Sequence, residues 1–231
     1  MKRRFYRVFA FFLAVCGLFC SFSVEISASC VYRSVSLASG KKQVALTFDD
    51  GPHPRLTKEI LAILEAYGIK ATFFMIGENV ENYPDVARAV ADAGHEIGNH
   101  TETHRHLASL DEAALTKELE SCKESIFRVC GVYPSLFRPP EGATPAFVLR
   151  CAEKFSYPVI LWSIDTKDWE VKSTGKIADS VLSGIKPGAI ILLHDYVGKN
   201  SKTPEALRVL LPILLEQGYE FVTVSELLGL S

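Results

Sequence analysis

The chain has 231 residues and a formal net charge of −2 at pH 7, and 48% of its residues are hydrophobic. This length and composition suit one large globular unit, and we expect a single domain rather than two. Because no basic run occurs beyond the first seven residues, the charge pattern argues against nucleic acid as a partner. Nothing in the sequence indicates a protein partner.

The amino-terminal segment has the pattern of a secretory signal. Basic residues at 2–4 precede an apolar run over 8–24, and this order is typical of a signal peptide. We therefore predict a signal peptide at 1–28, a short linker at 29–41, and export of the protein, either secreted or kept in the cell envelope. Two alternatives stay open: the run is nearly long enough to remain as a membrane anchor, and Cys30 is a faint candidate for lipid attachment. An uncleaved amino terminus is the only membrane contact that we expect.

Strands and helices alternate through residues 42–231, which we assign to the single domain. The predicted strands are 44–48, 71–76, 95–98, 135–138, 158–163, 189–193 and 220–224. Several of them are apolar on both faces, as in a parallel sheet covered by helices. Seven such β/α units predict an α/β fold, a barrel related to the TIM barrel but one strand short.

Helices are predicted between these strands from their start and stop signals. The expected helices are 57–67, 84–93, one from Ser109 (with Glu112 completing a capping box) to Gly131, and two that begin at Thr144-Pro145 and Thr203-Pro204. Pro212 should kink the last helix or split it in two. Cys122 and Cys130 share one of these helices at a separation of roughly 12 Å. They are too far apart to form a disulfide, and Cys122 should be a buried core thiol.

The first predicted strand ends in Thr47-Phe48-Asp49-Asp50-Gly51-Pro52. Asp49 and Asp50 stand where the strand becomes a loop. Two adjacent carboxylates resist joint ionisation unless a cation lies between them or they take different roles. The alternative is an Asp-Gly-Pro turn whose carboxylates cap the backbone.

His100 and His104 follow the third predicted strand and are four residues apart. On one helical turn this spacing would bring both imidazoles to one face, within reach of a single metal ion. With an aspartate they make a three-ligand set that leaves coordination positions open, as in catalytic sites. The alternative is a solvated pair or a pair of core histidines.

Further polar residues also follow strand ends, namely Arg138, Asp165 and His194. Because barrel enzymes build their sites from the loops at the carboxyl ends of the strands, we expect all of these residues to converge in one cleft. His95 and His106 are expected to have no role there, and His53 is a candidate to support the first motif from behind.

Three more motifs continue the pattern: Arg138-Pro139-Pro140-Glu141-Gly142, Asp165-Thr166-Lys167-Asp168-Trp169 and Leu192-Leu193-His194-Asp195. Together with the first two, and in this order, they resemble the five motifs of the polysaccharide deacetylase family, also called the NodB homology domain or carbohydrate esterase family 4. The resemblance covers residues 42–228. It implies a distorted (β/α)7 barrel and a catalytic domain at 42–231.

The resemblance also implies a metal-dependent hydrolase that removes acetyl groups from N-acetylated glycans, with peptidoglycan or a chitin-type oligosaccharide as substrate. Two alternatives are an O-acetyl esterase acting on a xylan-type polysaccharide and a catalytically silent glycan-binding module. The complete set of acid, base and ligand residues argues against the silent module.

The matching motifs imply a role for each candidate residue. Asp50, His100 and His104 are similar to the ligands of one divalent metal ion; zinc suits this set, and cobalt, nickel and manganese are alternatives. Asp49 is similar to the general base that acts on the attacking water, and Arg138 to the arginine that pairs with it.

His194 is similar to the general acid, which Asp165 would orient. Glu141, Trp169 and Leu192 are the expected substrate-binding residues, and the backbone N–H of Glu141 is the expected donor to the oxyanion. Glu141 departs from the family pattern, in which a tyrosine is usual, so the contacts of a tyrosine side chain are lost. Asp168 and Asp195 are assigned hydrogen bonds and no catalytic role.

Overall fold

The computed structural model describes residues 30–31, 40–196 and 201–230. The predicted signal peptide and most of the predicted linker lie outside the described residues. Within the described ranges, no helix is both long enough and apolar enough to cross a membrane.

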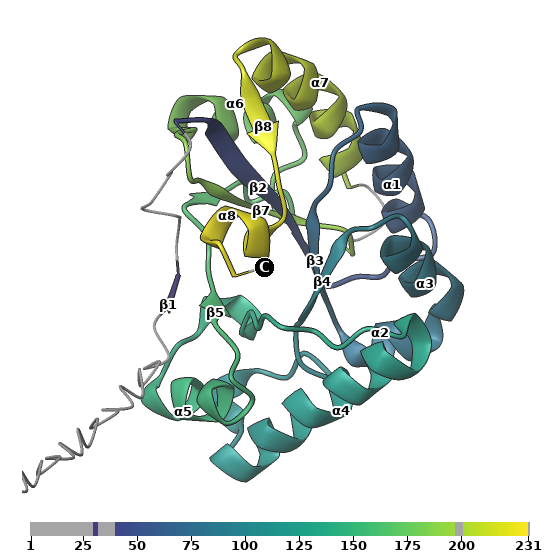
Figure 1. Cartoon of the computed structure of the whole chain (residues 1–231), viewed down its shortest axis with the longest axis vertical. Helices are drawn as coiled ribbons and strands as arrows, with labels where there is room; N and C mark the ends of the chain where they lie inside the picture. Colours follow the sequence, from purple (N-terminus) through teal and green to yellow (C-terminus); the bar gives the residue numbers. More distant parts are fainter. Residues whose placement is uncertain (1–29, 32–39, 197–200, 231) are drawn as a thin grey trace, which may run out of the picture.

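Parallel strands occupy the middle of the molecule, and helices surround them (Figure 1). The strands are β1 (Cys30–Val31), β2 (Lys42–Asp49), β3 (Thr72–Met75), β4 (Glu96–Asn99), β5 (Val159–Ile160), β6 (Ile164–Asp165), β7 (Ile190–His194) and β8 (Tyr219–Phe221). The main sheet has the order β4-β3-β2-β7-β6, with β8 also paired to β2 and β1 paired to β5. Every pairing between these strands is parallel, which confirms the predicted α/β class.

Helices separate most of the strands along the chain. They are α1 (Leu56–Ala66), α2 (Gly77–Asn82), α3 (Pro84–Asp92), α4 (Glu112–Cys130), α5 (Ala146–Lys154), α6 (Thr174–Gly184), α7 (Thr203–Glu216) and α8 (Val224–Leu228), with short 3-10 turns at Leu107–Ser109 and Pro140–Gly142. In Figure 1, α1 to α7 lie around the outside of the strands, whereas α8 lies over their middle.

Strand pairings, single bridges and one direct chain connection lead around the molecule from β2 and back to it. Single bridges join Asn99 at the end of β4 to Phe137, and Phe137 to Val159 in β5. β6 follows β5 directly along the chain and pairs with β7, which in turn pairs with β2. The barrel is therefore distorted on the side between β4 and β7, where strands of only two residues occur.

The interior of this ring is filled by apolar side chains and closed at one end by α8. One buried cluster consists of Ala45, Phe74, Leu136, Ile160, Ile190, Val224 and Leu227. The backbone N–H of Val224, the first residue of α8, donates to the side chain of Thr72, the first residue of β3, at 2.9 Å. Because α8 covers the amino ends of the strands, only their carboxyl ends remain available for a site.

The strand predictions are wrong at two places on the distorted side. Residues 135–138 form no strand, and only Phe137 makes bridges. Prolines precede and follow this segment, and proline has no N–H to donate to a ladder. The strand predicted at 158–163 shrinks to β5, and the next pairing begins only at Ile164.

The helix predictions are correct in position but not at every end. Asp111 rather than Ser109 caps α4, accepting a hydrogen bond from the N–H of Ala114 at 2.8 Å. Gly131 ends α4 with a left-handed φ of 72°, as its position predicts. The helix α7 runs continuously through Pro212, so the predicted split is wrong.

The two Thr-Pro starts are also shifted. Pro145 precedes the first turn of α5 instead of opening it, and Lys202 rather than Thr203 flanks α7. The sequence did not predict α6 or the short helices α2 and α8.

Candidate active site

A cavity of about 530 Å³ lies at the carboxyl ends of the strands. Its lining residues are Asp49, Asp50, His100, His104, Glu141, Trp162, Asp165, Trp169, Leu192 and His194. The predicted convergence of residues from separate loops is therefore confirmed. Arg138 lies behind this lining and is completely buried, and Trp162 is a lining residue that the sequence reading missed.

The two adjacent aspartates reach the same cavity because the backbone turns between them. Asp49 is the last residue of β2 and is buried, whereas Asp50 has a left-handed φ of 76°. Such a backbone is uncommon outside glycine, and it persists only where the surroundings hold it. Here the side-chain amide of Asn79 donates to the Asp50 carbonyl at 2.8 Å, and the N–H of Ile76 donates to the carbonyl of Gly51 at 3.0 Å.

The two histidines come together on a loop, so the predicted helical turn is wrong. His100 directly follows β4, and the loop then bends at Thr101 and His104, whose φ angles are 68° and 51°. The Asn99 side chain accepts a hydrogen bond from the N–H of Thr101 at 2.9 Å, and the Thr101 hydroxyl accepts one from the N–H of His104 at 3.2 Å. This bent loop places the two imidazole centroids 5.0 Å apart.

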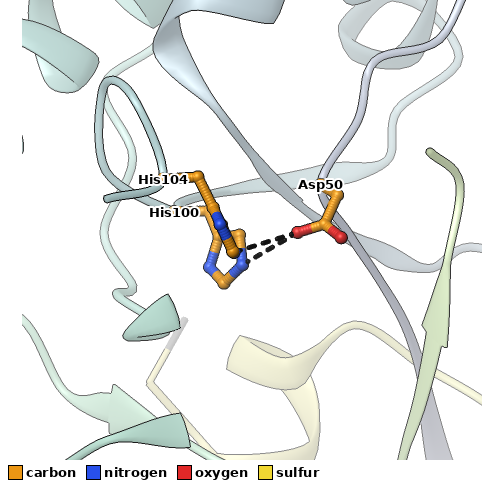
Figure 2. A group of neighbouring side chains, drawn as sticks. All are labelled: Asp50, His100 and His104. Atoms are coloured by element: carbon orange, nitrogen blue, oxygen red, sulfur yellow. Dashed lines mark ion pairs between the residues drawn. The ribbon is translucent and has the colours of Figure 1, made fainter. Parts of the chain in front are cut away.

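Asp50, His100 and His104 form a group that suits one metal ion (Figure 2). The Oδ1 atom of Asp50 lies 3.3 Å from Nε2 of each histidine, and the three potential ligand atoms all lie within 4.8 Å of one another. Nδ1 of His100 is 2.7 Å from the carbonyl of Arg138, so that nitrogen is the donor and Nε2 keeps its lone pair. One oxygen and two imidazole nitrogens fit the divalent cations that the sequence suggested.

Ionisation of this group also suits a cation. Burial alone would raise the pKa of Asp50, but the hydrogen bond and charge of His100 hold it below its usual value. Burial opposes protonation of His100, whereas the charge of Asp49 and the contact with Asp50 raise its pKa. A proton and a metal ion would therefore compete for the His100 Nε2, so we expect metal affinity to fall at acid pH.

Arg138 forms a buried ion pair with Asp49. Its guanidinium lies 2.7 Å from Asp49 Oδ1 and 2.7 Å from the hydroxyl oxygen of Thr47. It also donates to the carbonyls of Ile160 and Leu161 at 3.1 and 3.0 Å. A buried cation is costly unless it is paired and hydrogen-bonded, and here both conditions are met. The predicted pairing of Arg138 with Asp49 is confirmed.

His194 lies on the strand beside Asp49. It ends β7, and the parallel ladder between β2 and β7 pairs it directly with Asp49. Its Nδ1 is 2.7 Å from Asp168 Oδ1, and its backbone N–H donates to Asp168 Oδ2 at 2.9 Å. The hydroxyl of Thr203 donates to the same Oδ2 at 2.5 Å. Burial by itself would lower the pKa of His194, but the hydrogen bond and charge of Asp168, with Asp49 and Asp50 nearby, raise it to about 9.

The prediction that Asp165 orients His194 is wrong, because Asp168 occupies that position. Asp168 is fully buried, whereas Asp165 is exposed at the end of β6 and its Oδ1 accepts the N–H of Lys167 at 2.9 Å. Lys167 has a left-handed φ of 50°, and this bend turns the chain so that Asp168 faces inward. Asp165 lines the cavity without contacting the imidazole.

The three predicted substrate-binding residues all line the cavity, but they differ in exposure. Leu192 is buried, whereas 52% of the Trp169 surface is exposed. Glu141 has a left-handed φ of 58°, and its carboxylate lies 2.9 Å from Nδ1 of His106. Gly142 follows with no room for a side chain, because a Cβ there would come within 2.7 Å of the Trp162 ring.

The remaining histidines and cysteines have structural contacts. Nδ1 of His95 accepts the N–H of Ala71 at 3.1 Å, away from the cavity lining. Nδ1 of His53 accepts the N–H groups of Arg55 and Leu56 at the start of α1. Cys122 is buried and not in a disulfide, as predicted, and Cys130 is also free.

Asp195 is a buried carboxylate beside the candidate ligand loop. It accepts a hydrogen bond from the Thr57 hydroxyl at 2.5 Å, and its backbone N–H donates to the carbonyl of Asp49 at 3.1 Å. Burial, with the charges of Asp50 and Asp49, raises the pKa of Asp195 to about 7. A side chain at Gly51 would collide with this carboxylate, which explains the glycine there.

Comparison with known proteins gives one consistent family. The family described as polysaccharide deacetylase matches residues 37–160. A peptidoglycan-N-acetylglucosamine deacetylase of Bacillus cereus is 40% identical over 199 residues, which cover 85% of this chain and 93% of that protein. A chitooligosaccharide deacetylase of Bradyrhizobium sp. is 35% identical over 209 residues, covering 85% of this chain and 95% of that protein.

Larger relatives and solved structures agree with this match. The peptidoglycan-N-acetylglucosamine deacetylase PgdA of Listeria monocytogenes is 36% identical over 195 residues, which are 84% of this chain but only 41% of that protein. The chain thus spans less than half the length of this relative. The solved structure of the Bc1960 peptidoglycan N-acetylglucosamine deacetylase superposes with a TM-score of 0.83 at 35% identity, over 89% of this chain and 95% of that one.

Proposed function

Because the chain belongs to the polysaccharide deacetylase family, we propose that it removes acetyl groups from N-acetylated glycans. The products are acetate and a free amine, and peptidoglycan or a chitin-type oligosaccharide is the proposed substrate. The observation that carries this proposal is that Asp49 and His194 are held in register on adjacent strands beside one candidate metal group.

Asp50, His100 and His104 are the proposed ligands of one divalent cation, with zinc as the first candidate. When bound, such a cation polarises the acetyl carbonyl and lowers the pKa of water. Side chains of this protein carry out the proton transfers of the proposed reaction.

Asp49 is the proposed general base. Its Oδ1 is held by Arg138, so Oδ2 is the oxygen that can accept the proton of the attacking water. Arg138 is an orienting residue, because it forms a buried ion pair with this carboxylate and does not line the cavity.

His194 is the proposed general acid. Its Nδ1 is bound to Asp168, which leaves Nε2 as the nitrogen that can donate a proton to the departing amine. An amine leaves an amide readily only when its nitrogen is protonated as the bond breaks. A pKa of about 9 keeps the imidazolium form dominant at neutral pH, as this role requires. Asp168 replaces Asp165 as the residue that positions it.

The rest of the cavity would bind the glycan. The exposed face of Trp169 offers a flat apolar surface for a sugar ring, and Leu192 offers a contact for the acetyl methyl. The backbone N–H of Glu141 is the proposed donor to the oxyanion, for which a fixed backbone donor is well suited. We also propose that the protein is exported, on the basis of the basic and apolar segment at 2–24.

Acetate release tests this function. Metal-loaded protein should release acetate from N-acetylglucosamine oligomers or from peptidoglycan, and His194→Ala should abolish most of that release. The same variant should keep a substantial share of its activity on an aryl acetate, whose leaving group departs without a proton. Release from acetylated xylan alone would instead support the O-acetyl esterase, and no release from any substrate would support the silent binding module.

A further inference from the structure

The cavity carries an unusual balance of charge. Four of its lining residues are carboxylates, namely Asp49, Asp50, Glu141 and Asp165. Among the described residues that line it, none is lysine or arginine. Besides these carboxylates the lining contains His194 and the proposed cation site, so only carboxylates that no neighbouring cation balances should repel anionic groups of a substrate and attract cationic ones.

The two inner carboxylates are already balanced. Asp49 forms a buried ion pair with Arg138 at 2.7 Å. Asp50 faces two histidines, each at 3.3 Å, and is a proposed ligand of the cation. Neither carboxylate is therefore free to set the preference for charge on neighbouring sugars.

The two outer carboxylates remain. The side chain of Asp165 is exposed, and its Oδ1 accepts a hydrogen bond from the backbone N–H of Lys167. The Glu141 side chain is 58% exposed, and Oε2 lies 2.9 Å from Nδ1 of His106, whose side chain is 66% exposed. Arg105 and Lys167 belong to neighbouring loops, but neither lines the cavity.

We propose that Glu141 is a specificity-determining residue: with help from Asp165, it favours glycans that carry a free ammonium group on a sugar beside the one being deacetylated. His106 opposes this preference because its imidazole already contacts the Glu141 carboxylate. This inference rests on the proposed function, since each deacetylation leaves one such ammonium group on the chain. A partly deacetylated chain therefore becomes a better ligand than a fully acetylated one, and a chain bearing a carboxylate becomes a poorer one.

Equilibrium binding of two matched sugars tests the inference without relying on turnover. The full chain is titrated calorimetrically with a glucosamine pentamer and with an N-acetylglucosamine pentamer, at mildly acidic pH where the amines are protonated. The measured quantity is the ratio of the two dissociation constants. Glu153, an exposed glutamate of α5 that does not line the cavity, provides the matched control Glu153→Gln.

Substitutions of Glu141 and of His106 should shift this ratio in opposite directions. Glu141→Gln should reduce the preference for the glucosamine pentamer by roughly two- to fivefold, a range typical of a partly exposed charge contact. His106→Gln should increase it by about two- to threefold, because it frees the Glu141 carboxylate. Both effects should shrink as the salt concentration rises, and Glu153→Gln should leave the ratio at its wild-type value.

The opposite signs exclude a purely structural role of the pair. If Glu141→Gln and His106→Gln shift the ratio in the same direction, the pair only ties two loops together and the inference is overturned. An unchanged ratio in Glu141→Gln overturns it as well. Acetate release from the acetylated pentamer is measured in parallel. If the ratio shifts as expected but no acetate is released, only the proposed function is refuted. If acetate is released but the ratio does not change, only this inference is refuted.

Discussion

Replacing Asp168 by asparagine tests how the protein controls the protonation of His194. The pKa of His194 is raised from 6.5 to about 9, which corresponds to ~3 kcal/mol in favour of the imidazolium form. Only 12% of the His194 side chain is exposed, so solvent screens little of this effect. A bound cation would offset the contributions of Asp49 and Asp50, but the hydrogen bond and charge of Asp168 would remain.

Asparagine keeps the size of Asp168 but removes its charge and one acceptor. The carboxylate accepts hydrogen bonds from the backbone N–H of His194 and the hydroxyl of Thr203, and it contacts the imidazole Nδ1. In Asp168→Asn, an NH2 group must face at least one of these donors. We expect the pKa of His194 to fall by about one to two units, and turnover of N-acetyl glycans to fall by roughly 10²- to 10⁴-fold.

The assay is the pH dependence of kcat on an N-acetylglucosamine oligomer. Wild-type activity should decline as the pH rises through about 9, and in Asp168→Asn this decline should move toward neutral pH. The matched variant Asp165→Asn should leave the alkaline decline where it is. A shift in Asp165→Asn with none in Asp168→Asn would refute the reasoning.

Stability provides a second readout of the same pair. Because the folded-state pKa of His194 is raised, its contribution to the free energy of unfolding is complete below pH 6.5 and is lost as the pH rises toward 9. In urea unfolding experiments, Asp168→Asn should remove most of this loss of unfolding free energy at alkaline pH.

Three further predictions concern the ligands, the base and the core. His104→Ala should lower the bound metal per chain, measured by elemental analysis, and should abolish the rise in melting temperature that metal produces; full occupancy in this variant would contradict its assignment as a ligand. Asp49→Asn should keep its metal but lose roughly 10²-fold or more in turnover. Its free energy of unfolding should also fall, because Arg138 loses its counter-charge. Stoichiometric loss of metal would instead reverse the roles assigned to the two aspartates. Burial, with the charge of Lys70 nearby, lowers the pKa of His95 to about 4, so its contribution to stability should be lost as the pH falls from 6.5 toward 4. His95→Gln should therefore reduce the acid loss of stability, by as much as ~3 kcal/mol in urea unfolding at the two pH values, and an unchanged acid loss would show that His95 is not its source.

Much of the site could be predicted from the sequence because its residues follow strand ends. An apolar strand that stops at a polar residue fixes that residue at one edge of the sheet, and a parallel sheet brings all such edges together. Asp49, His100 and His194 were placed correctly on this basis.

The sequence could not decide which of two aspartates faces inward. Asp165 and Asp168 belong to one motif, and the choice depends on the left-handed bend at Lys167 between them. A lysine gives no signal for such a bend, since any residue other than glycine adopts it rarely. The bent loop between His100 and His104 was missed for the same reason, because the spacing of the two histidines also suits a helix.

Trp162 was missed for a different reason. It ends the apolar segment Val159-Ile160-Leu161-Trp162, which reads as plain core. In the structure its ring lies against Gly142 and also 5.7 Å from the Arg138 guanidinium. The strand predicted at 135–138 is absent because prolines flank this segment and because the barrel is distorted on this side.

The register between β2 and β7 separates the proposed chemistry of this protein from its choice of substrate. The proposed base and acid, Asp49 and His194, lie opposite each other on one ladder, and neighbouring strands keep a spacing of about 4.8 Å. Glu141 and Trp169, by contrast, lie on loops outside that ladder. Segments 139–145 and 169–173, which leave Asp168 in place, should therefore be exchangeable with those of family members, which would retarget the protein to other glycans while the proposed proton-transfer pair stays in place.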